Sequence, residues 1–132
     1  MAPTMNPIAL ACTLVLGLLL FGFGPVISVT RGRTNTFIGF SGDPTDGLHK
    51  LIRAHANTAE YAPFLAVLFL YHGAHNPAAW IVWTMVAATA CRCLFVVGMV
   101  APRTMATPNP ARFFGALGTY VTGMALCVAL FL

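Results

Sequence analysis

The chain has 132 residues, a length that suits one domain. Hydrophobic residues make up 58% of it, and Asp, Glu, Lys and Arg together only 8%. A soluble domain carries about 25% charged residues because it must cover its surface with polar side chains. The composition therefore excludes an ordinary soluble enzyme, a disordered chain and a protein that binds nucleic acid through a basic face. We expect an integral membrane protein, with the net charge of +4 setting its orientation in the lipid bilayer.

Four apolar segments predict transmembrane helices. A helix needs about 20 residues to cross the hydrocarbon core, and the segments are residues 8–29, 48–71, 78–101 and 113–132. The first segment has no Lys or Arg before it and is longer than the apolar core of a typical signal peptide, which favours a span over a cleaved signal. The connections are short, so we expect an all-α, up-down four-helix bundle forming one domain over residues 1–132.

Basic residues predict the orientation of these spans. They gather in the first and third connections and their flanks, and they are Arg31, Arg33, Lys50, Arg53, Arg103 and Arg112. The N-terminal residues and the second connection contain no Lys or Arg. Because Lys and Arg stay on the cytoplasmic side, we expect loops one and three to be cytoplasmic and both termini to be non-cytoplasmic.

The first half of the second segment carries polar side chains on one face. At 3.6 residues per turn, this face contains His49, Arg53, Asn57, Glu60 and Tyr61. Charged groups in a span are costly and usually face the bundle interior or an aqueous cavity. A cation, an amide, a carboxylate and a phenol along one stripe are able to bind a zwitterionic ligand.

Internal pairing is the alternative interpretation of the same residues. Arg53, Asn57 and Glu60 could satisfy one another, or pair with Arg92 in the middle of the third segment. For Arg92 we expect an ion pair with Glu60, the one acid inside the spans, and holding a ligand is its second interpretation. From spacing alone, the structural and the functional interpretations of the stripe weigh equally.

The remaining thiols and imidazoles do not predict a metal site. The cysteines lie in apolar segments without ligand spacing, and they are Cys12, Cys91, Cys93 and Cys127. His72 and His75 supply two ligands, which are too few. We therefore expect no bound metal.

Small residues in the fourth segment predict close helix packing. They recur every four positions, at Gly115, Thr119, Gly123 and Cys127. Because small side chains let helices approach closely, we expect this face to serve packing, not chemistry.

The stretch Arg53-Ala-His-Ala-Asn57-Thr-Ala-Glu60-Tyr61-Ala-Pro63 resembles the signature of the MAPEG family. These are the membrane-associated proteins of eicosanoid and glutathione metabolism, including microsomal glutathione transferases and the leukotriene-forming synthase. The end of the first span, residues 26–33, is also similar, and Arg92 with Gly98 adds a weaker match. The residues of this stretch most resemble those of small bacterial members of the family. The resemblance covers the whole chain in length and in number of spans.

The resemblance implies a homotrimer of four-helix bundles in a bacterial inner membrane, with glutathione between subunits near the cytoplasmic side. It implies glutathione contacts from the second segment and from an arginine that ends the first. The matching positions are Arg31, Arg33, Arg53, His55, Asn57, Glu60 and Tyr61, where His55 replaces a frequent glutamine.

The third segment departs from the family pattern. Catalytic relatives have tyrosines where this chain has Phe95 and Met99, and an arginine that stabilises the glutathione thiolate where it has Ala106. Phe and Met do not hydrogen-bond like a phenol, and a thiol needs a nearby cation to ionise at neutral pH. Arg103, three positions earlier, is the best substitute and our candidate catalytic residue.

The function that the resemblance implies is a membrane-bound, glutathione-dependent transferase or peroxidase-like activity on lipophilic electrophiles. Glutathione would be the cosubstrate, and the acceptor would enter from the bilayer along the first and fourth spans. The alternative is a non-catalytic MAPEG-like protein that binds a lipid or a partner protein, and Phe95, Met99 and Ala106 favour it. A transporter has little support, because the chain has no acidic pair and no broken-helix repeat.

Overall fold

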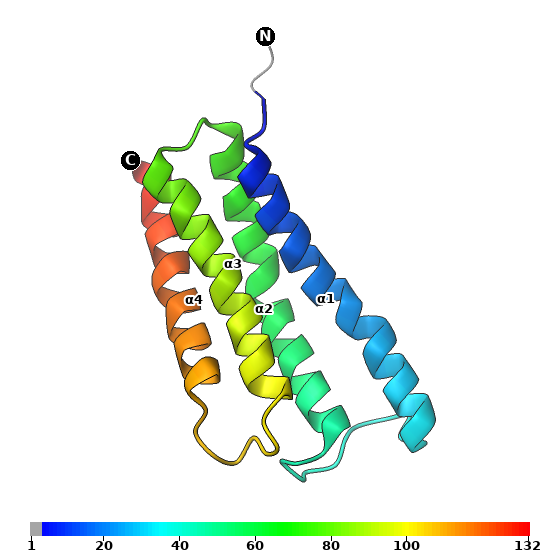
Figure 1. Cartoon of the computed structure of the whole chain (residues 1–132). Coiled ribbons are helices and arrows are strands. Elements are labelled where there is room, and N and C mark those ends of the chain that lie inside the picture. Colours follow the sequence, from blue (N-terminus) through cyan, green and yellow to red (C-terminus); the bar gives the residue numbers. More distant parts are fainter. Residues whose placement is uncertain (1–3) are drawn as a thin grey trace.

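The computed structural model describes residues 4–132. Its helices are α1 (Pro7–Thr34), α2 (Gly47–Ala74), α3 (Ala79–Val100) and α4 (Pro110–Val128), followed by the short 3-10 helix η1 (Ala129–Phe131). The helices run alternately up and down, so the loops after α1 and α3 lie at one end and the start of α1 and the C-terminus at the other (Figure 1). Over the described residues, this confirms the predicted all-α four-helix bundle and its up-down order.

Side-chain caps determine where three of the helices begin. Asn6, Asp46 and Asn109 precede α1, α2 and α4, and a side-chain oxygen of each accepts a backbone N–H from the first turn. Pro7 and Pro110 occupy the first helical position, where the missing N–H is not needed. These signals place the start of α4 three residues before the predicted start at position 113.

α1 extends five residues beyond its predicted end at position 29. Arg31 and Arg33 lie in its last turn, where cations interact favourably with the negative end of the helix dipole. Asn35 then ends the helix in the left-handed conformation, with φ of 54°. The apolar stretch is therefore shorter than the helix that contains it.

Three of the helical segments in the described chain are long and apolar enough to cross a membrane: α1, α3, and α4 together with η1. α2 has 28 residues, but Lys50, Arg53 and Glu60 interrupt the apolar character of its first half. It nevertheless lies alongside the other helices over most of their length (Figure 1). The polar half of α2 consequently lies at the end of the bundle that carries the loops after α1 and α3.

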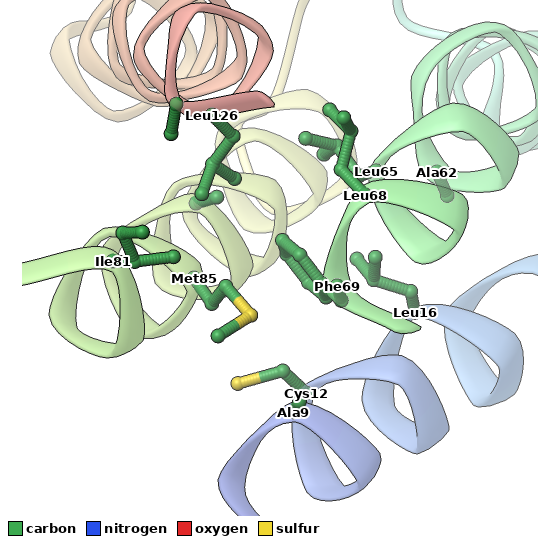
Figure 2. Packing of buried hydrophobic residues seen from close by; sticks show 12 residues of the cluster. Ala9, Cys12, Leu16, Ala62, Leu65, Leu68, Phe69, Ile81, Met85 and Leu126 are labelled. Carbon is green, nitrogen blue, oxygen red and sulfur yellow. The ribbon is translucent and has the colours of Figure 1, made fainter. Parts of the chain in front are cut away.

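The core has two parts along the bundle. Near the termini, all four helices contribute to one apolar cluster, in which Leu16, Phe69, Met85 and Leu126 are almost fully buried (Figure 2). Nearer the long loops, a smaller cluster contains Phe23, Ala54, Phe95 and Met99. Burial in the bundle thus accounts for the phenyl and thioether groups at positions 95 and 99.

α3 and α4 approach closely at glycines. A Cβ atom added at Gly115 would lie 2.5 Å from the backbone nitrogen of Phe95, and one added at Gly98 would overlap the backbone of Arg112. Thr119, one turn beyond Gly115, is also buried. The prediction of a packing face on α4 is therefore confirmed for the first half of that face, at Gly115 and Thr119. Gly123 instead has ordinary contact with Leu65 of α2, with 3.8 Å between the added Cβ and Cδ2.

Candidate functional site

The polar residues of α2 point in two directions. Arg53 and Glu60 are exposed on the outer side of the helix, whereas Asn57 and Tyr61 are half-buried. His55 follows Arg53 by two positions, which turns its side chain about 200° around the axis. The His55 ring accordingly packs against Phe23 of α1, with ring centroids 5.8 Å apart. One chain therefore does not bring His55 together with the Arg53–Glu60 face.

Arg92 is the buried centre of this region, with 1% of its surface exposed. Its Nη2 donates a hydrogen bond of 2.8 Å to Oδ1 of Asn57. The guanidinium carbon lies 5.4 Å from the centroid of the Tyr61 ring and 4.9 Å from that of Phe95. Among residues 4–132, Nε of Arg92 has no hydrogen-bond partner.

The predicted partner of Arg92 was wrong, because the acceptor is Asn57 and not Glu60. Three residues separate these positions, so Glu60 lies about 60° around the helix from Asn57. That rotation carries Asn57 toward α3 and leaves the Glu60 carboxylate exposed. The internal-pairing interpretation therefore holds for Asn57 alone.

The exposed charges of α2 do not neutralise each other. Arg53 and Glu60 are seven positions apart, about 10 Å along the helix axis. Both are exposed, on a helix that belongs to a membrane bundle. A bare charge facing hydrocarbon is costly. Covering this face with a polar ligand or a polar partner surface would remove that cost.

An apolar groove begins beside this charged face. It lies between α2 and α4, has a volume of about 760 Å³ and is lined at one end by Glu60 and Tyr61. Tyr120 of α4 faces Tyr61 there, with ring centroids 5.6 Å apart. The rest of the wall is mainly apolar and includes Phe64 and Met124. A lipophilic molecule fits the character of this groove.

A second cavity lies where the loop after α3 leads into α4. Its volume is about 840 Å³, and its lining includes Phe95, Ala106, Arg112 and Phe113. Phe95 and Ala106 are two of the positions at which the sequence departs from catalytic relatives. Two of the three positions at which the sequence differs from that pattern therefore line one cavity.

The sequence model of the MAPEG family matches residues 9–132, nearly the whole chain. The chain belongs to the MAPEG family. No curated protein and no solved structure gives a match. The family match confirms the resemblance carried by residues 53–63 and makes this chain a membrane protein of a family that includes glutathione transferases and peroxidases.

The arginines predicted in the loops of this MAPEG protein have separate environments. Nη1 of Arg31 donates to the carbonyl oxygens of Thr36 and Gly39, at 3.0 and 2.8 Å, and so folds the loop back on the end of α1. Arg33 is exposed. α1 diverges from α2 toward this end (Figure 1). Both arginines thus lie on the α1 side, away from the outer face of α2.

Arg103, the predicted catalytic residue, is exposed and does not line the cavity beside Ala106. Arg112 lines that cavity instead. Its Nη1 and Nη2 donate hydrogen bonds of 3.1 Å to the carbonyl oxygens of Met105 and Thr107. From the sequence, Arg112 contributed only to the predicted orientation of the spans in the membrane. The available signal was its place in the first turn after the Asn109–Pro110 helix start, from which a long side chain reaches back over the loop.

The two long loops form a joined surface at this end of the protein. Nζ of Lys50 donates to the carbonyl oxygen of Pro102 at 3.0 Å, and the backbone nitrogen of Met105 donates to Pro44 at 2.9 Å. These two hydrogen bonds anchor the loop beside the second cavity to the rest of the bundle. Within the first loop, hydrogen bonds from the backbone and the hydroxyl of Thr45 lower the pKa of Asp43 below its usual value.

The histidines near the termini have structural contacts. His72 is buried and its Nε2 lies 3.0 Å from the carbonyl oxygen of Leu126, so it donates a hydrogen bond between α2 and α4. His75 stacks on Tyr71. The four cysteines are free thiols. Across residues 4–132, no group of three His, Cys, Asp or Glu is placed to hold a metal ion.

Proposed function

We propose that this MAPEG protein is a glutathione-dependent transferase or peroxidase-like enzyme that acts on lipophilic electrophiles. The observation that carries the proposal is the exposure of Arg53 and Glu60 on one face of a membrane helix, beside Asn57 and Tyr61. Glutathione carries carboxylates and an ammonium group, which are the chemical partners of these side chains. Arg53 would bind a carboxylate through its planar fork, and Glu60 would accept a hydrogen bond from the ammonium.

A second copy of the chain would complete this site. His55, Arg31 and Arg33 lie on the side of the bundle formed with α1, and Arg53 and Glu60 lie on the outer side of α2. We propose a homotrimer in which the α1 side of one subunit covers the Arg53–Glu60 face of the next. Such an arrangement would unite all seven proposed ligand residues and remove two charges from contact with lipid.

The acceptor would reach this site from the bilayer. The groove between α2 and α4 supports this route, because it is apolar and ends at Glu60 and Tyr61. The sequence led us to expect a route along α1 and α4. Within one subunit we propose instead a route along α2 and α4, which line this groove. In conjugation, the glutathione sulfur forms a bond to the electrophilic carbon, the leaving group departs with its bonding electrons, and the thiol proton passes to solvent.

The proposed location is a bacterial inner membrane, with loops one and three on the cytoplasmic side. The positions of the basic residues support this orientation. It would place the polar half of α2 next to the cytoplasm, from which glutathione could enter.

Equilibrium binding of glutathione to the detergent-purified protein tests the proposal. We expect saturable binding that weakens about 10- to 100-fold in Arg53→Ala, because a charge-assisted hydrogen bond contributes about 1.5–3 kcal/mol. Arg103→Ala, which removes the same charge from an exposed loop position, is the matched control and should bind normally. Conjugation of 1-chloro-2,4-dinitrobenzene is then measured. Absence of binding at millimolar glutathione would contradict the proposal.

A non-catalytic binding protein is the second candidate. Phe95 and Met99 are buried, with 5% and 8% of their surfaces exposed. This burial favours the non-catalytic candidate, because both side chains pack in the apolar core. In that case the purified protein would bind a lipid or a partner protein and would not conjugate the chlorodinitrobenzene. Phe95→Tyr, which adds a phenol at the edge of the cavity, would then leave conjugation at zero.

A further inference from the structure

We propose that the seam between α2 and α4 binds one phospholipid with a primary ammonium headgroup. An acyl chain of this lipid lies in the apolar groove between the two helices. The headgroup lies in a polar pocket at the end of the bundle that carries the loop after α2. On α2 the seam follows the residues that line the two cavities on one face, which are Tyr61, Leu65, Leu68, His72 and His75. The inference does not depend on glutathione binding, although an acceptor in the same groove has to displace the chain.

The groove and the pocket are consecutive along this seam. The five α2 residues recur at intervals of four, three, four and three positions, which places them on one face of a helix. The groove extends to Leu68 on α2 and Val128 on α4. The pocket includes His72, one turn further along α2, and Ala129, directly after α4. Nε2 of His72 donates to the carbonyl oxygen of Leu126 at 3.0 Å and fixes the two helices relative to each other at this junction.

The seam has the length of one lipid leaflet. Glu60 in the groove and His75 in the pocket are 15 positions apart, which is about 22 Å along a helix axis. A leaflet with its headgroups is roughly 20–22 Å thick, half of the full bilayer. Tyr71 and Trp80 also line the pocket, and these residue types are typical of the headgroup level. A lipid with its headgroup in the pocket therefore extends its chain along the groove to the middle of the bilayer.

The pocket offers no charge to an anionic headgroup. Its volume is about 410 Å³, and its described lining residues include no Lys, Arg, Asp or Glu. A lipid with a net negative charge finds no cation there to pair with. A zwitterionic headgroup carries both charges itself, so it needs only hydrogen-bonding partners from the protein.

Both histidines of the pocket keep an acceptor nitrogen. Nδ1 of His75 lies 2.6 Å from the carbonyl oxygen of Tyr71, and Nε2 of His72 bonds that of Leu126. A carbonyl oxygen only accepts, so these two nitrogens carry the protons and the other nitrogen of each neutral ring is an acceptor. His75 is exposed, so its Nε2 is available to a ligand. Such a nitrogen accepts a hydrogen bond from a primary ammonium group, and the charge of the donor strengthens that bond.

The aromatic rings do not form a cage for a quaternary ammonium group. Such a group has no N–H donor and is bound instead by surrounding aromatic faces. One face of Tyr71 is covered by the stacked ring of His75, with centroids 4.4 Å apart and an interplanar angle of 28°. Trp80 is the other large aromatic residue among the described lining residues, and one ring beside it is too few for a cage. The pocket therefore favours ethanolamine over choline.

The experiment is a lipid titration of the detergent-purified protein at pH 8, with bound lipid counted by native mass spectrometry. The probes are dioleoyl-phosphatidylethanolamine and the phosphatidylcholine and phosphatidylglycerol with the same chains. We expect one bound phosphatidylethanolamine per chain, with an affinity about 10-fold higher than for either other lipid, because one charge-assisted hydrogen bond is added.

Variants at His75 test the headgroup contact. His75→Phe keeps a ring that stacks on Tyr71 but removes the acceptor, so it should abolish the preference for phosphatidylethanolamine. His75→Gln supplies an acceptor oxygen and should retain part of the preference. His49→Phe removes an imidazole at the opposite end of α2 and is the matched control that should bind as wild type does.

A variant in the groove tests the position of the chain. Gly123 lines the groove, so Gly123→Leu places a side chain in the path of the lipid. It should weaken binding of phosphatidylethanolamine and phosphatidylcholine alike and leave the ratio of their affinities unchanged. Thermal unfolding in detergent shows that each variant is folded.

Several results would overturn the inference. Equal affinity for the three lipids would show that the pocket does not recognise the headgroup, and tighter binding of phosphatidylcholine or phosphatidylglycerol would assign it a different one. An unchanged preference in His75→Phe would remove the histidine contact, and unchanged binding in Gly123→Leu would place the chain outside the groove. None of these results bears on whether the protein binds glutathione, so the proposed function is tested separately.

Discussion

Arg92 shows how a single buried charge is accommodated in an apolar bundle. Its guanidinium group lies over the rings of Tyr61 and Phe95 and donates to Asn57, a neutral acceptor. Aromatic faces attract a guanidinium group through their quadrupoles, so the rings contribute part of the stabilisation that a carboxylate would otherwise supply. Removing the one hydrogen-bond acceptor should therefore be costly.

We predict that Asn57→Ala lowers the free energy of unfolding by about 1–3 kcal/mol, because the buried Arg92 loses its hydrogen bond. The measurement is thermal unfolding in detergent without glutathione. The double variant Arg92→Met with Asn57→Leu is the control, and it should recover much of this loss because apolar groups often replace a buried polar pair at little cost. Equal stability of Asn57→Ala and wild type would contradict the role assigned to this hydrogen bond.

At the scale of the helices, glycines determine how closely α3 and α4 pack. The two helices meet at Gly98 and Gly115, where backbone atoms of the partner helix occupy the place of a side chain. The first turn of α4 forms part of the wall of the cavity that Arg112 lines, so this contact also shapes that cavity.

We predict that Gly115→Ala lowers the free energy of unfolding by about 1–3 kcal/mol, the usual range for overpacking, since the new Cβ would lie 2.5 Å from the backbone of Phe95. Gly123→Ala on the same helix is the matched control. There the nearest atom is 3.8 Å away, and the better helix propensity of alanine should leave stability unchanged or raise it by up to about 1 kcal/mol. Thermal unfolding of both variants in detergent checks this. An equal loss in both would show that contact with α3 is not the cause.

At the scale of the whole molecule, the distribution of polar groups along the bundle is uneven. The end that carries the loops after α1 and α3 contains the charged residues, the polar half of α2 and the second cavity. The opposite end carries the histidines His72 and His75 and the tryptophans Trp80 and Trp83. This asymmetry gives the protein two chemically different membrane surfaces.

We predict that the charged end faces the cytoplasm, because Lys and Arg are retained on that side. In a variant without cysteines, Ser41→Cys should resist a membrane-impermeant maleimide in intact bacterial cells and react once the cells are opened. Ala78→Cys, exposed in the short loop after α2, should react in intact cells. The reverse labelling pattern would show that the orientation is inverted.

Much of the architecture could be predicted from local sequence alone. Apolar length predicts spans because hydrocarbon requires about 20 residues of helix. Small residues at four-residue spacing predicted a packing face on α4, and the structure places this face against α3 at Gly115. The boundaries were less accurate, since α1 extends to Thr34 on polar residues that hydropathy excludes. The stripe on α2 was predicted as one polar face, but Arg53 and Glu60 are exposed, whereas Asn57 turns toward α3 and accepts a hydrogen bond from Arg92.

The sequence by itself determined the membrane class, the four helices, their order and the MAPEG signature, because these depend on composition, periodicity and residues close in the chain. Only the tertiary structure decided which side chains meet. Asn57 and Arg92 are 35 positions apart, and Arg112 reaches the loop beside Ala106 because α4 packs on Gly98 of α3. Such contacts depend on the rotation and spacing of whole helices, which the spacing of residues along one helix does not specify.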